Sequence, residues 1–297
     1  MGKAKVDWHT RPADIFKKDI VLDRFRRYLR GIGLKDETIK LYLCTVGGFL
    51  EYAKCEDPGF ETANKYRSML VDQGLSKGHI NNTCFGIRKF YGMDKLTWEF
   101  PFLKPNEGIP YYFDDRDVQA IFSVCSNIKH LAMLQVLFFG CLRSSEMCKL
   151  DDEDLDFRTK SMRLRETKNG SDGIAYMNDE CAETLRIYLK IRPELQIGDR
   201  TPLFYTDAGN VWVNNDVHRM FAYYKKKAGI TKPGGVHVFS RHTTATMMIA
   251  KGCDIRIVKE LLRHKDIRTT LRYAHVSDKT KRSSYEQYLI IIVIASN

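Results

Sequence analysis

The sequence predicts a mainly α-helical protein with a small β-hairpin, an α+β fold divided between two domains. Three observations predict it: apolar residues recur at helical spacing over most of the chain, a segment rich in proline and glycine interrupts this pattern near residue 100, and two short segments beyond residue 160 alternate polar and apolar residues. Helical spacing buries one face of a helix, whereas alternation buries one face of a strand. A chain of 297 residues can bury a core in each of two domains.

The first third of the chain predicts four short helices. They cover about residues 19–30, a stretch from a capping Asp36 to Leu50, residues 61–72 and residues 77–93. Each carries an apolar stripe, and glycines stop the first and the third. We therefore expect an N-terminal tail over residues 1–17 and a helical domain over residues 18–99, with Lys and Arg side chains on its outside.

Residues 100–110 hold three prolines and a glycine, which is typical of an interdomain linker. A mixed domain over residues 111–287 follows. Its pattern predicts helices over 114–126, 128–139, 179–191, 214–228, 240–251 and 254–263, with strands over 161–166 and 173–177 around a turn. The last ten residues, 288–297, form an apolar segment that is shorter than the roughly 20 residues of a membrane span.

The composition limits the classes of function that the chain can have. The chain carries 48 Lys and Arg against 37 Asp and Glu, a net charge of +11, which favours a nucleic-acid partner but is also compatible with a merely basic surface. None of its eight cysteines forms a C-x-x-C pair, which argues against a zinc site and a disulfide framework. The N-terminal residues lack the apolar region of a signal peptide, so we expect a cytoplasmic protein bound to the chromosome.

Two motifs carry the chemistry. The first runs from R-H-x-x-A-T at Arg241 through G-x-D-x-R-x-V-x-x-L-L-x-H, which ends at His264, to Tyr273 nine residues later. The second, G-C-L-R-S-S-E-M-C-K-L over residues 140–150, looks like a G-x-R-x-x-E-x-x-x-L box with one extra residue before Arg143. Together they resemble the tyrosine recombinases, the family that includes phage integrases, Xer and Cre.

The resemblance implies a two-domain clamp on DNA, in which a helical core-binding domain of the SAM-like kind precedes a tyrosine-recombinase catalytic domain. It implies that Tyr273 attacks the scissile phosphate, forms a 3′-phosphotyrosyl link and frees a 5′ hydroxyl. The intermediate keeps the phosphodiester energy, so no ATP, metal or other cofactor is expected. The implied partners are double-stranded DNA carrying a specific recombination site and further copies of the chain, which would form a tetramer on paired sites.

The resemblance also assigns roles to single residues. Arg143 and Arg241 would grip the scissile phosphate, for which the planar fork of guanidinium is well suited. Glu146 would support Arg143, and His264 would hydrogen-bond the phosphate or help to position Tyr273, whose phenol has an ordinary pKa of about 10 and needs activation. Taken alone, each residue also has an ordinary structural explanation: a surface ion pair, a structural histidine, a half-buried tyrosine.

Two further positions follow from the resemblance. Lys168, at the tip of the predicted hairpin, would enter the minor groove and protonate the leaving 5′ oxygen; alone, it would be a solvated lysine. The family has a histidine three residues before the second arginine, but here His237 lies four residues before Arg241 and Val238 takes the usual place. Either a local loop lets His237 reach the phosphate or its role has weakened or moved. We retain His237 as a site residue.

The remaining expectations concern partners and alternatives. Groove-facing side chains of the first domain are expected to be Lys77, His79, Asn81, Asn82, Arg88 and Lys89, although a solvated helix face explains them equally well. The acidic run over residues 151–156 lacks a matching ligand set and is interpreted as a solvated turn rather than a magnesium site.

An integrase of an archaeal or bacterial mobile element fits the compact form of the chain and the altered arginine boxes best. The alternatives are relaxation of supercoils, as by a type IB topoisomerase, or a catalytically inactive DNA-binding regulator on the same fold. The apolar segment over residues 288–297 would pack on a neighbouring protomer or close the domain of its own chain.

Overall fold

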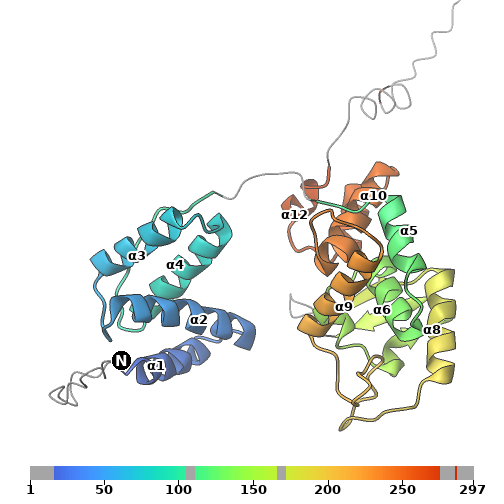
Figure 1. Cartoon of the computed structure of the whole chain (residues 1–297), viewed down its shortest axis with the longest axis horizontal. Helices are drawn as coiled ribbons and strands as arrows, with labels where there is room; N and C mark the ends of the chain where they lie inside the picture. Colours follow the sequence, from blue (N-terminus) through green and yellow to red (C-terminus); the bar gives the residue numbers. More distant parts are fainter. Residues whose placement is uncertain (1–16, 105–110, 166–171, 275–284, 286–297) are drawn as a thin grey trace, which may run out of the picture. The chain divides into compact units, whose positions relative to one another are not determined.

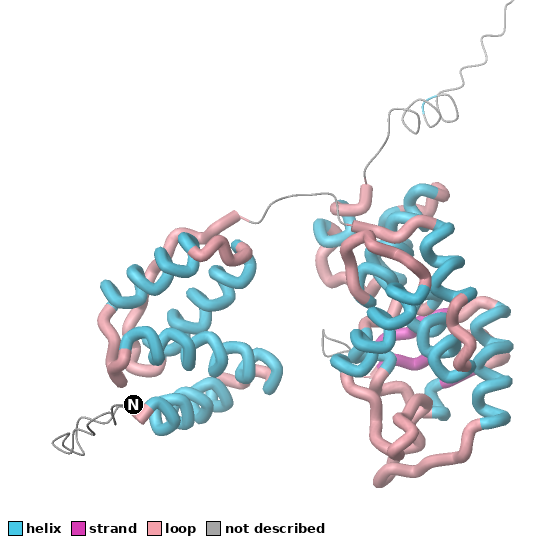
Figure 2. Tube along the Cα trace, in the orientation of Figure 1, coloured by secondary structure: helices cyan, strands magenta, loops and turns pink. Residues whose placement is uncertain are grey.

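The computed structural model describes residues 17–104, 111–165, 172–274 and 285. The chain forms two compact units, divided between residues 107 and 108. Helices dominate both units, and the second unit also contains a small sheet, so the α+β class predicted from the sequence is confirmed (Figure 1, Figure 2). No helix in the described part of the chain is long and apolar enough to cross a membrane.

The first unit consists of four helices around one core: α1 (Lys18–Gly31), α2 (Asp36–Ala53), α3 (Phe60–Asp72) and α4 (Lys77–Gly92). Each matches one of the stretches predicted from the apolar stripes. Phe25, Phe49 and Ile87 are fully buried where α1, α2 and α4 pack together. α4 begins where the hydroxyl of Ser76 accepts a hydrogen bond from the backbone N–H of His79 at 3.2 Å, which satisfies an otherwise unpaired donor.

The second unit has ten helical elements and three strands among its described residues. They are α5 (Asp115–Ser123), α6 (Ile128–Phe139), α7 (Ser144–Met147), the 3₁₀ turn η2 (Asp152–Asp154), β1 (Leu155–Asp156), β2 (Ser161–Leu164), β3 (Gly173–Tyr176), α8 (Asp179–Ile191), α9 (Asn214–Lys227), the π-helical turn η3 (Val238–Thr243), α10 (Thr244–Ala250), α11 (Ile255–Leu261) and α12 (Arg268–Leu271).

The sheet is antiparallel in the order β1-β2-β3, and Met162 of β2 faces Ala175 of β3. β2 and β3 are the predicted hairpin. β1 pairs with β2 over only two residues, which is too short for alternation to reveal it in the sequence.

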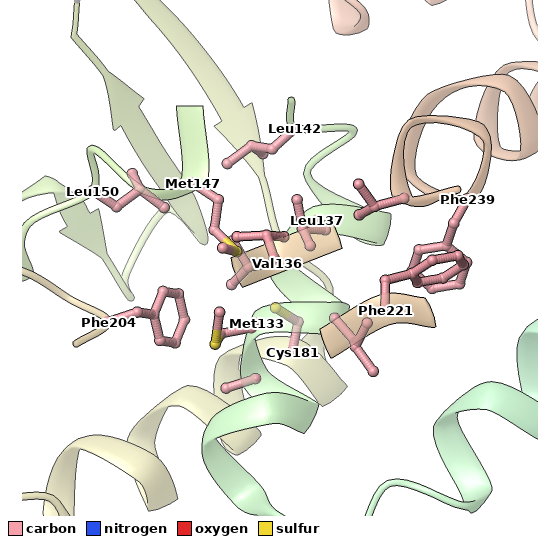
Figure 3. Close-up of a cluster of buried hydrophobic side chains, with 14 of the residues drawn as sticks. Met133, Val136, Leu137, Leu142, Met147, Leu150, Cys181, Phe204, Phe221 and Phe239 are labelled. Atoms are coloured by element: carbon pink, nitrogen blue, oxygen red, sulfur yellow. The ribbon is translucent and has the colours of Figure 1, made fainter. Parts of the chain in front are cut away.

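Helix α6 lies at the centre of the second core. Its sequence is nearly all apolar, and Met133 and Leu137 are completely buried. Around it, Phe221 of α9 packs on Phe239 of the π-helical turn with ring centroids 5.1 Å apart (Figure 3). This packing fixes the position of the turn that carries Arg241.

The acidic run over residues 151–156 is only in part the solvated turn that we expected, because Glu153 is exposed but two other carboxylates are buried. Asp151 and Asp154 are only 2% and 4% exposed. Arg165, directly after β2, lies 3.2 Å from the carboxylate of Asp151 and 2.8 Å from that of Asp154, and Arg200 reaches Asp151 at 2.9 Å. A buried carboxylate is costly unless it is paired, so these arginines explain how Asp151 and Asp154 can be buried.

Candidate active site

A small hydrophobic cluster brings the predicted catalytic segments together. Its buried members are Cys141, Ala245, Val258, Leu262 and Tyr273. Along the sequence, Cys141 follows α6, Ala245 lies in α10 and Val258 lies in α11. Leu262 follows α11, and Tyr273 follows α12. Tyr273 is 6% exposed within this cluster, so its ring is held against the segments that carry Arg143, Arg241 and His264.

Glu146 fixes the side chain of Arg143. Arg143 immediately precedes α7, its backbone N–H donates to the Glu146 carboxylate at 2.8 Å, and its Nη1 donates to the same carboxylate at 2.5 Å. Glu146 is 6% exposed. Burial alone would raise the pKa of Glu146, but the charges of Arg263 and Arg143 keep it below its ordinary value. Glu146 is therefore a carboxylate at neutral pH and can hold the guanidinium in one direction.

Arg241 is almost completely buried, at 1% exposure. Its Nη1 donates to the carbonyl of Cys141 at 2.8 Å, and its Nη2 donates to the carbonyl of Leu262. Burial, followed by the charges of two neighbouring arginines, lowers the pKa of Arg241 to about 10, so it keeps its charge at neutral pH. The two carbonyls orient a guanidinium that has five N–H donors in total.

The extra residue between His237 and Arg241 is accommodated by a π-helical turn. Residues 236–250 form one continuous helix, in which Val238–Thr243 are π-helical and the flanking residues are α-helical. Each hydrogen bond of a π-helix closes one residue later than in an α-helix, so one more residue fits into the turn. The local loop considered from the sequence is absent from this stretch, and both side chains belong to the same helix.

His237 lies close to positive groups although solvent still reaches it. Partial burial, followed by the charges of His242, Arg241 and Arg143, lowers its pKa, so the imidazole lies within electrostatic reach of both arginines. The ring of His242 lies between those of His237 and Tyr273, with centroid distances of 5.0 and 5.5 Å.

His264 and Tyr273 are linked through the short helix between them. Nδ1 of His264 lies 2.9 Å from the hydroxyl of Thr270, three residues before Tyr273. Burial, followed by the charges of Arg241 and Arg143, lowers the pKa of His264 to about 4, so the ring is neutral at pH 7. Burial raises the pKa of Tyr273 more than the nearby arginines lower it, so the free protein holds a protonated phenol.

Asn81 was predicted to face DNA, but its side chain is buried inside the first unit. It is 4% exposed and bonded twice to the backbone of Leu103, at 2.8 and 3.0 Å, so its amide cannot reach a groove. Arg88 is half-buried, lies 4.6 Å over the ring of Phe100 and donates to the carbonyl of Trp98.

The exposed members of the group predicted to face DNA are Lys77, His79, Asn82 and Lys89. Lys168 lies outside the described residues.

The structure corrects our interpretation of the first arginine box. The residue two positions before Arg143, where the G-x-R pattern has glycine, is Cys141, and it adopts the left-handed conformation that glycine favours, with φ of 50°. Gly140 has a φ of −77°. The box therefore contains no extra residue: Cys141 takes the glycine position. Counting back from Arg143 in the sequence would have found it.

Sequence reasoning also missed Arg263. Its side chain is 9% exposed and contacts Glu146, and it also adopts the left-handed conformation, with φ of 54°. Nothing in its sequence position, directly before His264, distinguishes it from a surface arginine. As for metals, the residues that the structure describes include no group of three or more His, Cys, Asp or Glu that could hold an ion.

Comparison with known proteins places this geometry in context. Residues 112–280 match the model of the phage integrase family. Tyrosine recombinase XerA of Pyrococcus horikoshii is 28% identical over 294 residues, which cover 95% of this chain and 97% of that protein. Tyrosine recombinase XerC of Staphylococcus carnosus is also 28% identical and covers 84% of this chain and 89% of its own.

Solved structures agree with these relatives. The crystal structure of XerA recombinase matches with a TM-score of 0.54 and 26% identity, over 92% of this chain and 99% of that one. The Tn1549 transposon integrase in complex with circular intermediate DNA matches with a TM-score of 0.72 and 22% identity, over 90% of this chain and 99% of that one. The likeness to the transposon integrase is one of fold.

Proposed function

This chain belongs to the phage integrase family, and we propose that it is a tyrosine recombinase that cleaves and rejoins DNA at specific sites. The observation that best supports this is that Arg143 and Arg241 both act on His237 and His264, and that Arg241 also acts on the buried Tyr273. Two guanidinium groups held in place by neighbouring protein groups suit a phosphate, and a neutral histidine suits a proton acceptor. The relatives named as tyrosine recombinases span most of the chain.

In the proposed reaction, the hydroxyl oxygen of Tyr273 attacks the scissile phosphorus. A bond forms between that oxygen and phosphorus, and the bond from phosphorus to the 5′ oxygen breaks. Arg143 and Arg241 stabilise the charge that builds on the phosphoryl oxygens. His237 and His264, whose pKa values are lowered, are available in the neutral form to accept the phenolic proton.

The 5′ oxygen leaves as a hydroxyl once it has taken up a proton, for which the resemblance proposes Lys168 as the donor. A 5′ hydroxyl of a partner strand then attacks the phosphotyrosyl link and releases Tyr273. The covalent link conserves the phosphodiester energy, so the proposed cycle uses no ATP and no metal.

We propose that residues 18–99 form a core-binding domain and residues 111–287 the catalytic domain, joined by the linker at residues 100–110. The exposed basic and polar side chains of α4, namely Lys77, His79, Asn82 and Lys89, are the proposed DNA contacts of the first unit. Contacts to phosphate make affinity fall steeply with salt concentration. With DNA as its substrate, the protein is proposed to act in the cytoplasm at the nucleoid.

We further propose that four copies assemble on paired sites and that the apolar segment over residues 288–297 packs on a neighbouring protomer. A truncation that ends at Tyr285 tests this by size-exclusion chromatography on DNA that carries the site. The truncated protein should still bind single sites but should fail to pair them. Unchanged pairing would contradict the proposal and favour a segment that closes its own domain.

A plasmid assay tests the proposed function and separates it from its alternatives. The binding site is first selected from random duplex DNA, and two copies are then placed in one supercoiled plasmid. A recombinase should give recombinant circles of defined size. Relaxed circles without recombinants would favour a topoisomerase, and binding without any cleavage would favour an inactive regulator.

A further inference from the structure

Arg263 contacts both groups that hold the arginines of the proposed active site. Its Nη2 lies 2.7 Å from the carbonyl oxygen of Cys141 and 3.0 Å from the carboxylate of Glu146, and its Nη1 donates to the carbonyl of Leu261 at 2.8 Å. Its side chain is 9% exposed. Arg263 is therefore part of the protein interior, not a surface arginine.

Arg263 shares its partners with the two arginines of the proposed active site. The Glu146 carboxylate also binds Arg143, and the Cys141 carbonyl also binds Nη1 of Arg241 at 2.8 Å. One guanidinium thus connects to the first phosphate-binding arginine through a carboxylate and to the second through a backbone carbonyl. Movement of Arg263 would disturb both.

The backbone conformation of Arg263 indicates that its side chain has a specific role. A φ of 54° is readily adopted by glycine and is unfavourable for residues with a Cβ atom. Cys141, whose carbonyl Arg263 binds, has the same conformation, with φ of 50°. An arginine where the backbone favours glycine indicates that its guanidinium supplies an interaction that glycine cannot supply.

The net charge of the groups around Glu146 suggests what the guanidinium of Arg263 contributes. Arg143, Arg241 and Arg263 gather around the single carboxylate of Glu146, which leaves an excess of two positive charges. A phosphodiester carries one negative charge, and the pentacoordinate phosphorus of the transition state carries about one more. The cluster is therefore matched better to the transition state than to the bound substrate, as catalysis requires.

We propose that Arg263 is a positioning residue for the cleavage step: it holds Glu146 and the Cys141 carbonyl, and through them Arg143 and Arg241. It acts on the reaction through these groups rather than by contact with the DNA. The inference rests on the proposed function of the same site.

Two variants of Arg263 and one matched control test it. Arg263→Gly removes the guanidinium at a backbone position that accepts glycine, and Arg263→Lys keeps the charge but loses the fork. Lys160→Gly is the control, because Lys160 is also a basic left-handed residue of the second unit, with φ of 50°, outside the site. The measurements are the dissociation constant and the single-turnover cleavage rate on a nicked duplex with the selected site.

We expect Arg263→Gly to lower the cleavage rate on the order of 10²-fold, the effect of a small displacement of catalytic groups from their productive geometry, with little change in DNA affinity. Arg263→Lys should be intermediate, and Lys160→Gly should cleave at the unmutated rate. Added guanidinium ion should restore part of the rate of Arg263→Gly alone, which a merely structural role would not allow.

Cleavage by Arg263→Gly at the unmutated rate would overturn the inference and leave the proposed function intact. A loss that follows only the fraction of unfolded protein, without rescue by guanidinium, would overturn it as well. Absence of cleavage by the unmutated protein on a site that it binds would instead overturn the proposed function, and the inference with it.

Discussion

The backbone carbonyl of Cys141 accepts a hydrogen bond from Nη1 of Arg241 at 2.8 Å, between residues that are 100 positions apart in the sequence. This bond ties the loop before α7, which carries Arg143, to the π-helical turn, which carries Arg241. The two halves of the proposed phosphate site are thus joined directly, within one small buried cluster.

Arg241→Lys should lose both stability and cleavage. A lysine ammonium cannot reproduce the fork that meets the carbonyls of Cys141 and Leu262, and an unpaired buried acceptor costs about 1–3 kcal/mol. Urea denaturation should show a loss of that size in the free energy of unfolding, and cleavage should fall on the order of 10²-fold or more. Arg256→Lys, with a side chain 83% exposed, is the matched control. Equal stability of the two variants would contradict the account.

Arg165→Gln should destabilise the fold, whereas Arg163→Gln on the same strand segment should not. Arg165 neutralises Asp151 and Asp154, whose side chains are 3% and 1% exposed, so its loss should cost about 1–3 kcal/mol. Arg163 is 66% exposed in its ion pair with Asp172, and such pairs contribute about 0–1 kcal/mol. Thermal denaturation compares them, and similar melting temperatures would argue against the buried network.

Cys141→Gly should be tolerated better than Cys181→Gly, although both thiols are buried. At Cys141 the loss of the side chain is offset by relief of a left-handed backbone, a conformation that costs a non-glycine residue about 1–2 kcal/mol. Cys181 lies in α8, where glycine adds a further cost of up to about 1 kcal/mol. Urea denaturation measures both losses. A larger loss at Cys141 would show that its conformation carries no strain.

Stability should depend on pH between about 6.5 and about 4. His264 has an ordinary pKa of 6.5, which burial and the nearby arginines lower to about 4, so over this window the unfolded chain binds a proton that the folded protein does not. The free energy of unfolding must then decrease as the pH is lowered through the window. His264→Gln should reduce this slope, as measured by urea denaturation at several pH values.

Glu146→Gln provides the contrast for that experiment. The pKa of Glu146 is held below its ordinary value of 4.5, so its contribution is present above pH 4.5 and is lost only as the pH falls further. The slope between pH 6.5 and 4.5 should therefore survive in Glu146→Gln. An unchanged slope in His264→Gln would mean that the histidine titrates alike in both states.

The sequence predicted those features that depend on residues close together in the chain, and it did not predict those that depend on residues far apart. The four helices of the first unit follow from their own apolar stripes and stop signals, and these were predicted. The burial of Asp151 depends on Arg165 and Arg200, which lie 14 and 49 residues away, so no local pattern indicates it. The π-helical turn that contains Arg241 depends on the packing of Phe239 in the core, so one extra residue could equally have predicted a loop.

Transfer of a labelled DNA strand to the protein tests the central claim most directly. In EDTA, a nicked duplex with the selected site should trap a covalent adduct that maps to Tyr273 by peptide mass. Tyr273→Phe should bind the same duplex and give no adduct, whereas Tyr285→Phe, at a tyrosine 65% exposed, should still give it. An adduct that persists in Tyr273→Phe, or none from an unmutated protein that binds the site, would contradict the account.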